Sequence, residues 1–289
     1  AGLMCRAVIA DATGRILGQY GLFRLNECYH GLYEAGHAMV LKECRGMGYE
    51  TALHVYAIRV LMPLIGGEEL WGETVANHVF MQRSALRIGA KEWGIELDLM
   101  PAESYASEKS ASGRVSAVVH SVCYREKPHT VYLPVPYADL LKNIYDHAGR
   151  NRRLEAASGA LPEDIETRYA ETFIAGAGVL RVSVLEAGAD AAALTDRLVK
   201  KYTETGAVVL QVFLPLDQPV SGALVDVLNR RGFFFSAVVP RWFDADALVM
   251  QKLTQSTDYG QIHLVSDLAK EMLSVIREDR SRVERLAAQ

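Results

Sequence analysis

The chain has 289 residues, of which half are hydrophobic and 23% are charged. This balance is typical of a folded globular protein and excludes a disordered chain. The formal net charge of −4 at pH 7 gives no reason to expect a nucleic-acid surface, and the length is sufficient for two domains of ordinary size.

The four cysteines, Cys5, Cys28, Cys44 and Cys123, lie far apart in the sequence. They form no CxxC pair and no zinc-finger spacing, so we expect reduced thiols rather than disulfides or a metal site. No apolar run approaches the length of a membrane span, and the first residues lack the apolar core of a secretory signal. We therefore expect a cytoplasmic protein without metal, membrane or nucleic-acid partners.

The first half of the chain is predicted to alternate strands and helices. Asn77 is expected to cap one of these helices, because its side chain can accept a hydrogen bond from the first turn. The expected elements are a β-hairpin at 3–10 and 15–23, a strand at 36–41, a helix from 49, a strand at 69–75, a helix at 77–88, strands at 93–100, 114–124 and 131–134, and a helix at 137–150.

A polar stretch rich in Gly, Ala and Ser, 151–161, is the expected linker between a domain at 1–150 and a domain at 162–289. The second half repeats the order of elements of the first, so we interpret the chain as one supersecondary plan used twice. The expected elements of the second half are strands at 169–175 and 179–186, a helix at 190–203, a strand at 207–214, a helix at 220–231, strands at 233–239 and 247–253, and an amphipathic helix at 262–286.

The turn after strand 36–41 suits a phosphate group. Gly46 and Gly48 allow the backbone to approach an anion closely, and Arg45 adds a positive charge beside them. The first N–H groups of the helix that follows have no partner within the helix and point toward the same place. A phosphate cradle is one interpretation of this turn, and an ordinary glycine-containing turn between strand and helix is the other.

Three stretches together resemble the GCN5-related N-acetyltransferase (GNAT) superfamily. They are 35–53 with its Arg45-Gly-Met-Gly48 turn, 71–89 with a strand and a helix that ends in glycine, and 229–252 with a closing helix and strand pair. The resemblance implies an α/β (α+β) fold with two GNAT-like mixed β-sheets and flanking helices. It also implies a tandem protein whose first copy lacks its initial helices in this chain and whose second copy is degenerate.

The resemblance further implies acetyl-CoA, or another acyl-CoA, as cosubstrate. Glu50 departs from the family's loop pattern, and a carboxylate there would face the diphosphate. At about 4 Å, two like charges repel by roughly 4 kcal/mol at an effective dielectric constant near 20. The implied donor site consists of Met39, Val40 and Leu41 along the pantetheine, Arg45, Gly46, Met47 and Gly48 around the diphosphate, and Asn77 near the donor.

Acyl transfer to an amine needs a general base and a general acid. Glu34, His37 and Glu73 are the candidate bases on the strands of the donor site, and His78 is a candidate acid or donor contact. A satisfied histidine and a solvated carboxylate at a strand end are the alternative interpretations of His37 and Glu73. Many family members place a tyrosine where this chain has Ala85 and, in the second copy, Leu228, neither of which can donate a proton. The tyrosines that could replace it are Tyr49, Tyr105 and Tyr124.

The equivalent turn of the second half, Glu186-Ala-Gly-Ala-Asp190, has one glycine, two acids and no arginine. It cannot form a comparable anion nest, so we expect the donor in the first domain only. The resulting prediction is an acyl-CoA-dependent N-acyltransferase that acts on an unidentified amine, either a small molecule or a protein lysine. The alternative is a non-catalytic acyl-CoA sensor or interaction scaffold of the same fold. The sequence leaves the oligomeric state open, with a homodimer as one option.

Overall fold

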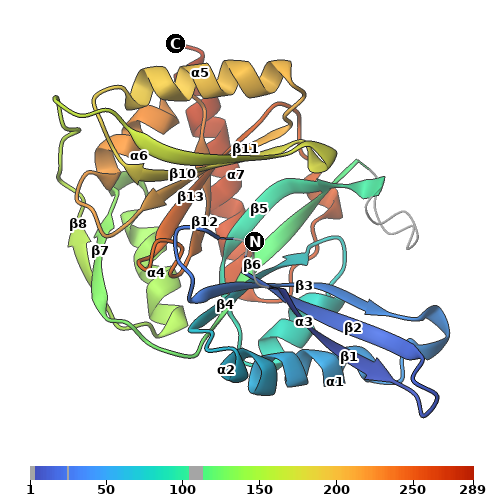
Figure 1. The fold of residues 1–289 in the computed structure, drawn as a ribbon. Helices are drawn as coiled ribbons and strands as arrows, with labels where there is room; N and C mark the ends of the chain where they lie inside the picture. The colour runs from blue at the N-terminus through green and yellow to red at the C-terminus, as the bar shows by residue number, and fades with distance from the viewer. Residues whose placement is uncertain (1–3, 25, 104–112) are drawn as a thin grey trace.

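One mixed β-sheet of eleven strands runs through the molecule (Figure 1). The computed structural model describes residues 4–24, 26–103 and 113–289. The strand order is β1-β2-β3-β4-β6-β5-β12-β13-β11-β10-β9, and β7 and β8 form a separate parallel pair. The strands are β1 Met4–Ala10, β2 Ile16–Phe23, β3 Leu32–Val40, β4 Glu69–Val75, β5 Lys91–Pro101, β6 Arg114–Cys123, β7 His129–Leu133, β8 Arg152–Ala156, β9 Arg168–Ile174, β10 Val179–Glu186, β11 Val209–Pro215, β12 Phe234–Val239 and β13 Ala247–Leu253.

Helices cover the sheet in both halves. The α1 and α2 helices lie against β1–β3, and α5 lies over β10 and β11 (Figure 1). Among the described helices, none is long and apolar enough to cross a membrane. The α-helices are α1 Tyr49–Tyr56, α2 Met62–Leu64, α3 Phe80–Arg87, α4 Ala138–Ala148, α5 Ala191–Glu204, α6 Ser221–Asn229 and α7 Asp267–Ala287.

The two halves use the same order of strand pairing. In the first half, β3 and β4 are parallel, and the antiparallel strands β6 and β5 follow. In the second half, β10 and β11 are parallel, and the antiparallel strands β13 and β12 follow. This is the pairing order that a repeated plan predicts. The duplication itself and the domain limits 1–150 and 162–289 stay predictions.

Strands β5 and β12 join the two halves of the sheet. Their backbone pairing consists of one residue pair, Gly94 and Ala237. A Cβ atom on Gly94 would lie 2.3 Å from the Cα of Ala237, so only glycine permits this approach. The long C-terminal helix α7 packs on both β5 and β12 and therefore spans the junction. The expected pair of sheets is thus one continuous sheet.

One hydrophobic core includes residues from both halves. Trp71 of β4 meets Trp242, which follows β12, edge to face at 5.6 Å between ring centroids. Trp242 in turn stacks on Phe213 of β11 at 4.2 Å. A second cluster, around Tyr33 and Leu53, lies under α1. The face of β4 that carries Trp71 therefore lies against the second half, while the opposite face lies under the helices of the first half.

Several local expectations differ from the structure. The strand expected at 36–41 is β3, which already begins at Leu32, and the helix expected at 262–286 is α7, which begins at Asp267. The predicted linker 151–161 contains β8, whose backbone pairs in parallel with β7 from His129 onward. The predicted helix at 77–88 begins only at Phe80, with Val79 at its N-cap, so the expectation that Asn77 caps it was wrong. The chain around Ala76 is held instead by a distant segment, because the Ala76 carbonyl accepts a hydrogen bond from the His263 amide at 2.7 Å.

Candidate functional site

Strands β3 and β4 separate halfway along their length. Their parallel pairing runs from Leu32 opposite Glu69 to Ala35 opposite Gly72 and ends there. Beyond that point β3 continues along β2, and β4 continues along β6. The backbone of β3 past Ala35 is therefore open on the side of β4, within the residues described, and a ligand can pair with it there.

A bulge interrupts β3 at the start of this open part. The register with β2 shifts between Gly36 and Met39, and His37 adopts φ +53°. Such a bulge turns backbone amides out of the regular ladder. The His37 side chain is exposed and its ring meets Phe23 edge-on at 4.5 Å. The structure thus places His37 at the separation, with its ring against β2.

The turn between β3 and α1 is open at its two glycines. Gly46 and Gly48 have φ +81° and +80°, and a Cβ atom on either would meet no atom within 4 Å. Gly48 is the N-cap of α1, whose first amides point outward from the turn. The Arg45 Nε donates to the Val40 carbonyl at 3.4 Å, which ties the turn to the open end of β3. The predicted phosphate cradle is therefore accessible from solvent.

Glu50 does not carry the full repulsion expected from the sequence. Its carboxylate lies 3.6 Å from His54 Nδ1, and His54 also contacts Ser84 of α3 at 3.0 Å. Burial raises the pKa of Glu50, while hydrogen bonds from Thr51 and Ser84 oppose this. Burial also lowers the pKa of His54 to about 4, so that ring is neutral at pH 7. Glu50 is thus turned toward His54 and toward Ser84 of α3.

An acidic cluster lies at the separation of the strands, on the face that meets the second half. It comprises Glu34 of β3, Glu73 of β4 and Glu96 of β5, together with Arg181 of β10. The Arg181 Nη2 donates to Glu73 Oε1 at 2.5 Å. Gln211 of β11 links the cluster further, since its Nε2 donates to Glu96 Oε1 at 2.7 Å. Three carboxyl groups therefore share one guanidinium.

Burial and mutual repulsion set the protonation of this cluster. Burial, and then the nearby Glu73 carboxylate, raise the pKa of Glu34 to about 7, while Arg181 opposes this. Burial and Glu73 also raise the pKa of Glu96 well above its ordinary value. Among the described residues no donor reaches Glu96 Oε2, so this oxygen is placed to hold a proton. Glu34 is the carboxyl that changes charge near neutral pH.

Sequence analysis missed two members of the cluster, Glu96 and Arg181. A weak signal for them exists, because each is a charged residue flanked by apolar neighbours within a strand, Ile95 and Leu97 around Glu96 and Leu180 and Val182 around Arg181. Buried charges of this kind are almost always paired. Of the predicted bases, Glu34 and Glu73 are brought together, and His37 does not contact them in the described structure.

His78 and Asn77 lie in the bend between β4 and α3. The His78 ring packs on Phe80 at 5.4 Å between centroids. Its Nδ1 is buried, and no hydrogen-bond partner for that atom is present among the described residues. His78 therefore has a ring nitrogen available beside the end of β4, and its role as an acid stays a prediction, as does donor binding by Asn77.

The alternative proton donors differ in their surroundings. Tyr124 donates its hydroxyl to the Ile58 carbonyl at 2.8 Å, within the contact between α1 and the sheet. Tyr49 is the first residue of α1, and Tyr105 lies outside the described residues. Ala85 and Leu228 are both buried.

The equivalent turn of the second half is closed by neighbouring backbone. The Gly188 amide donates to Thr167 Oγ1 at 3.0 Å, and the Ala189 amide donates to the Ile165 carbonyl at 3.0 Å. Asp190 accepts the Thr167 amide at 2.7 Å, and a Cβ atom on Gly188 would lie 2.4 Å from the backbone of Glu166. The segment 165–167 thus occupies the place where an anion would have to bind.

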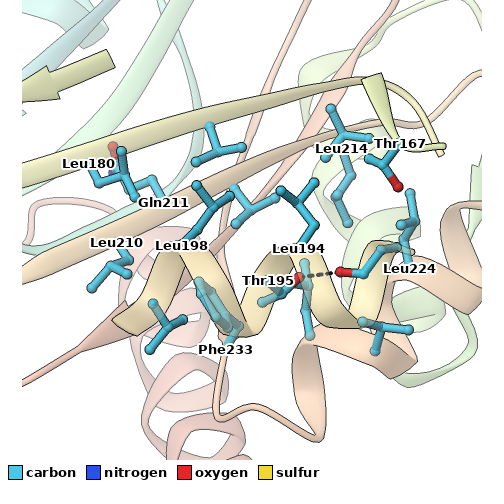
Figure 2. Close-up of a pocket in the computed structure, with 17 residues that line it drawn as sticks. Thr167, Leu180, Leu194, Thr195, Leu198, Leu210, Gln211, Leu214, Leu224 and Phe233 are labelled. Carbon is cyan, nitrogen blue, oxygen red and sulfur yellow. Dashed lines mark hydrogen bonds between the residues drawn. The ribbon is translucent and has the colours of Figure 1, made fainter. Parts of the chain in front are cut away.

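Apolar side chains fill the space between the strands and helices of the second half. Figure 2 shows Leu194, Leu198, Leu210, Leu224 and Phe233 facing one another there. The cavity that remains is about 30 Å³. A space of this size cannot hold a cofactor arm, and its apolar lining offers few hydrogen-bond partners to a water.

Comparison with known proteins adds the following findings. No protein-family model matches the sequence, and no curated protein matches it. Among solved structures, the chain is similar to the ribosomal-protein-S18-alanine N-acetyltransferase from Escherichia coli, with 14% identity and a TM-score of 0.35 over 43% of this chain and 71% of that chain. It is similar to a GCN5-related N-acetyltransferase from Kribbella flavida, with 18% identity and a TM-score of 0.35 over 42% of this chain and 67% of that chain.

A third similar structure is the spermidine N-acetyltransferase from Vibrio cholerae in complex with CoA and spermine. It shares 13% identity and a TM-score of 0.35 over 42% of this chain and 65% of that chain. These likenesses cover less than half of the present chain and concern its architecture alone, a mixed sheet with flanking helices.

Proposed function

We propose that this chain is an acyl-CoA-dependent N-acyltransferase, with acetyl-CoA as the donor, that acts on an amine. One observation carries the proposal. The pairing of β3 with β4 ends at Ala35 and Gly72, next to both an open anion turn and a carboxyl group that titrates near pH 7. The donor and the acceptor can therefore meet at one point, where the two strands separate.

The donor side is formed by β3 and the turn that follows it. The outward amides near Gly46 and Gly48, with Arg45 beside them, suit the diphosphate of coenzyme A. The edge of β3 at Met39 and Val40 suits the amide groups of the pantetheine arm, which pair as a strand would, whereas the Leu41 amide already donates to the Leu17 carbonyl at 2.9 Å. When bound, the donor supplies an acyl group as a thioester whose carbonyl is the electrophile.

The acceptor side is formed by the acidic cluster. Glu34 accepts one proton from the ammonium group of the acceptor, and its pKa of about 7 suits a general base at neutral pH. The free amine attacks the thioester carbonyl, the new C–N bond forms, and the C–S bond breaks. The nitrogen releases its second proton as the amide forms, and this proton restores the one that the leaving thiolate takes up. The leaving thiolate takes up a proton, for which His78 is the proposed donor. The excess of carboxyl groups favours a cationic acceptor, a small-molecule amine or a protein lysine.

A single donor site, in the first half, follows from the contrast between the two turns. The backbone at Gly46 and Gly48 is free of neighbouring atoms, whereas the turn at Gly188 is filled by the segment 165–167. We propose that the second half contributes the wall of the acceptor side and binds no donor.

Isothermal titration calorimetry with acetyl-CoA tests the donor site. We expect binding of one molecule per chain, and absence of heat at millimolar ligand would contradict the proposal. Turnover is then measured as free thiol release with a panel of amines that includes polyamines, amino acids and lysine peptides. The Glu34→Gln variant should retain donor binding and lose turnover. Donor binding without thiol release from any amine would support the alternative, a non-catalytic acyl-CoA sensor.

A further inference from the structure

Arg181 reaches from the second half into the acidic cluster of the first half. Its Nη2 donates to Glu73 Oε1 at 2.5 Å, and its Nε donates to Gln211 Oε1 at 2.9 Å. Its guanidinium also lies 5.6 Å from the centroid of the Trp71 ring, within the range of a cation–π contact. The side chain is only 15% exposed. Contacts in three directions therefore hold the guanidinium in one place.

The charged groups that face Glu34 come from three other strands. They are Glu73 of β4, Glu96 of β5 and Arg181 of β10. Because Glu96 is placed to hold a proton, the negative charges that remain are those of Glu34 and Glu73. One guanidinium, that of Arg181, faces both carboxylates. Without it, ionisation of Glu34 would place two carboxylates together in a buried site, which is strongly disfavoured.

We propose that Arg181 is the positioning residue that keeps Glu34 in its basic form and fixes the Glu73 carboxylate, so that the acceptor side of the site is shared between the two halves. The role assigned to Glu34 rests on the proposed function, whereas the contact between the halves does not. Arg181 touches neither donor nor reacting atoms in this scheme, and it acts through the carboxylates that it faces. The second half is then part of the catalytic apparatus although its own turn is closed.

The direct test is an NMR titration of the full chain labelled with ¹³C at the glutamate side-chain carboxyl. The Glu34 signal is assigned by its loss in Glu34→Gln. In Arg181→Gln, the midpoint of this signal should rise by at least about one pH unit, a tenfold increase in proton affinity. In Glu73→Gln, removal of the like charge should move the midpoint in the opposite direction. An unchanged Glu34 midpoint in Arg181→Gln, or a rise in Glu73→Gln, overturns the proposal.

Arg114→Gln provides a matched control. Arg114 is also partly buried at the contact between the halves, where its Nη2 donates to the carbonyls of Leu99 and Ala177 at 2.7 and 2.8 Å. This variant should lower stability and leave the Glu34 midpoint in place. If Arg181→Gln does not fold, Glu73→Gln alone decides, because its predicted shift has a definite sign.

Activity measurements distinguish a failure of this inference from a failure of the proposed function. If the wild type acylates an amine, the acid limb of kcat/KM should move upward in Arg181→Gln by the same amount as the Glu34 midpoint. A moved midpoint without any turnover in the wild type would refute the enzyme and leave the coupling of the halves intact. Turnover in the wild type, with an unmoved midpoint and acid limb in the variant, would refute the role of Arg181 alone.

Discussion

Replacement of Gly48 by alanine separates the binding role of the open turn from its structural role. Gly48 has φ +80°, and a Cβ atom there would meet nothing within 4 Å. The only cost to the free protein is therefore the left-handed backbone, about 1–2 kcal/mol for an L-residue. The added methyl group would project into the space by which we propose the diphosphate approaches. We expect the dissociation constant for coenzyme A to rise at least about tenfold, or 1.4 kcal/mol.

Gly14→Ala is the matched control. Gly14 lies in the exposed turn between β1 and β2, has φ +85°, and also has no atom within 4 Å of a built Cβ. Because conformation and free space are the same, both variants should lose the same unfolding free energy in urea titrations, within about 0.5 kcal/mol. Calorimetry with coenzyme A should distinguish them, with wild-type affinity for Gly14→Ala only. Equal affinities in all three proteins would refute the assignment of the turn as the donor site.

Three further outcomes are expected. Glu34→Gln should lower kcat/KM for the acceptor by about 10²–10⁴-fold and abolish the acid limb near pH 7, and an unchanged pH profile would exclude Glu34 as the base. Gly188→Ala should lower the unfolding free energy by about 1–3 kcal/mol, because the methyl group overlaps the backbone at Glu166, and calorimetry should find coenzyme A affinity intact. Asp246→Asn should cost about 3–5 kcal/mol in urea unfolding, because it removes the fully buried carboxylate that Arg152 binds at 2.7 and 3.1 Å and leaves that guanidinium only the partly exposed Glu126 carboxylate. Burial works to raise the pKa of Asp246, but hydrogen bonds from His129 and Arg152 hold it well below its ordinary value. The ionised Asp246 carboxylate therefore contributes to the unfolding free energy above about pH 4, and this contribution is lost as the pH falls. The unfolding free energies of the wild type and the variant should converge in acid.

An exposed ion pair serves as the control for Asp246→Asn. Arg168 and Glu186 form a pair at 2.7 Å with side chains 69% and 47% exposed. Removal of its carboxylate in Glu186→Gln should cost less than about 1 kcal/mol. A cost as large as that of Asp246→Asn would show that burial does not determine the difference.

Local sequence patterns were sufficient for most of the elements. The strands predicted at 69–75, 179–186 and 247–253 have those bounds in the structure. In each case an apolar or alternating run ends at a polar or glycine-containing turn, so the information lies within a few residues. The strand predicted at 36–41 overlaps β3, but the residues of β3 that pair with β4, Leu32–Ala35, lie before the predicted strand.

Contacts between distant residues explain what the sequence did not predict. Asn77 has the chemistry of an N-cap, but the Ala76 carbonyl binds the amide of His263, and α3 starts three residues later than predicted. Strand β8 lies in a stretch with linker composition, and it becomes a strand because β7 offers it an edge. Neither the hydrogen bond to Ala76 nor the pairing of β8 with β7 can be predicted from a window of ten residues.

The residues of the candidate site also differ in whether a short stretch of sequence is sufficient to propose them. The turn at Gly46 and Gly48 could be proposed as an anion site from the sequence because its residues are consecutive. Glu73 was recognised as a carboxylate near the end of a strand, but its partner Arg181 is 108 positions away and lies on β10, in the other half of the sheet. Its pairing depends on how the eleven strands curve, which no short motif encodes.

The contact at Gly94 gives the molecule a sensitive point on β5, the strand that also carries Glu96. Every side chain larger than hydrogen at this position would act as a wedge against Ala237 and tilt one half relative to the other. The Arg181 guanidinium would then move away from Glu34 and Glu73, although no residue of the acidic cluster had been changed. A substitution at Gly94 would therefore disturb the acidic cluster in the same way as a change of Arg181 itself.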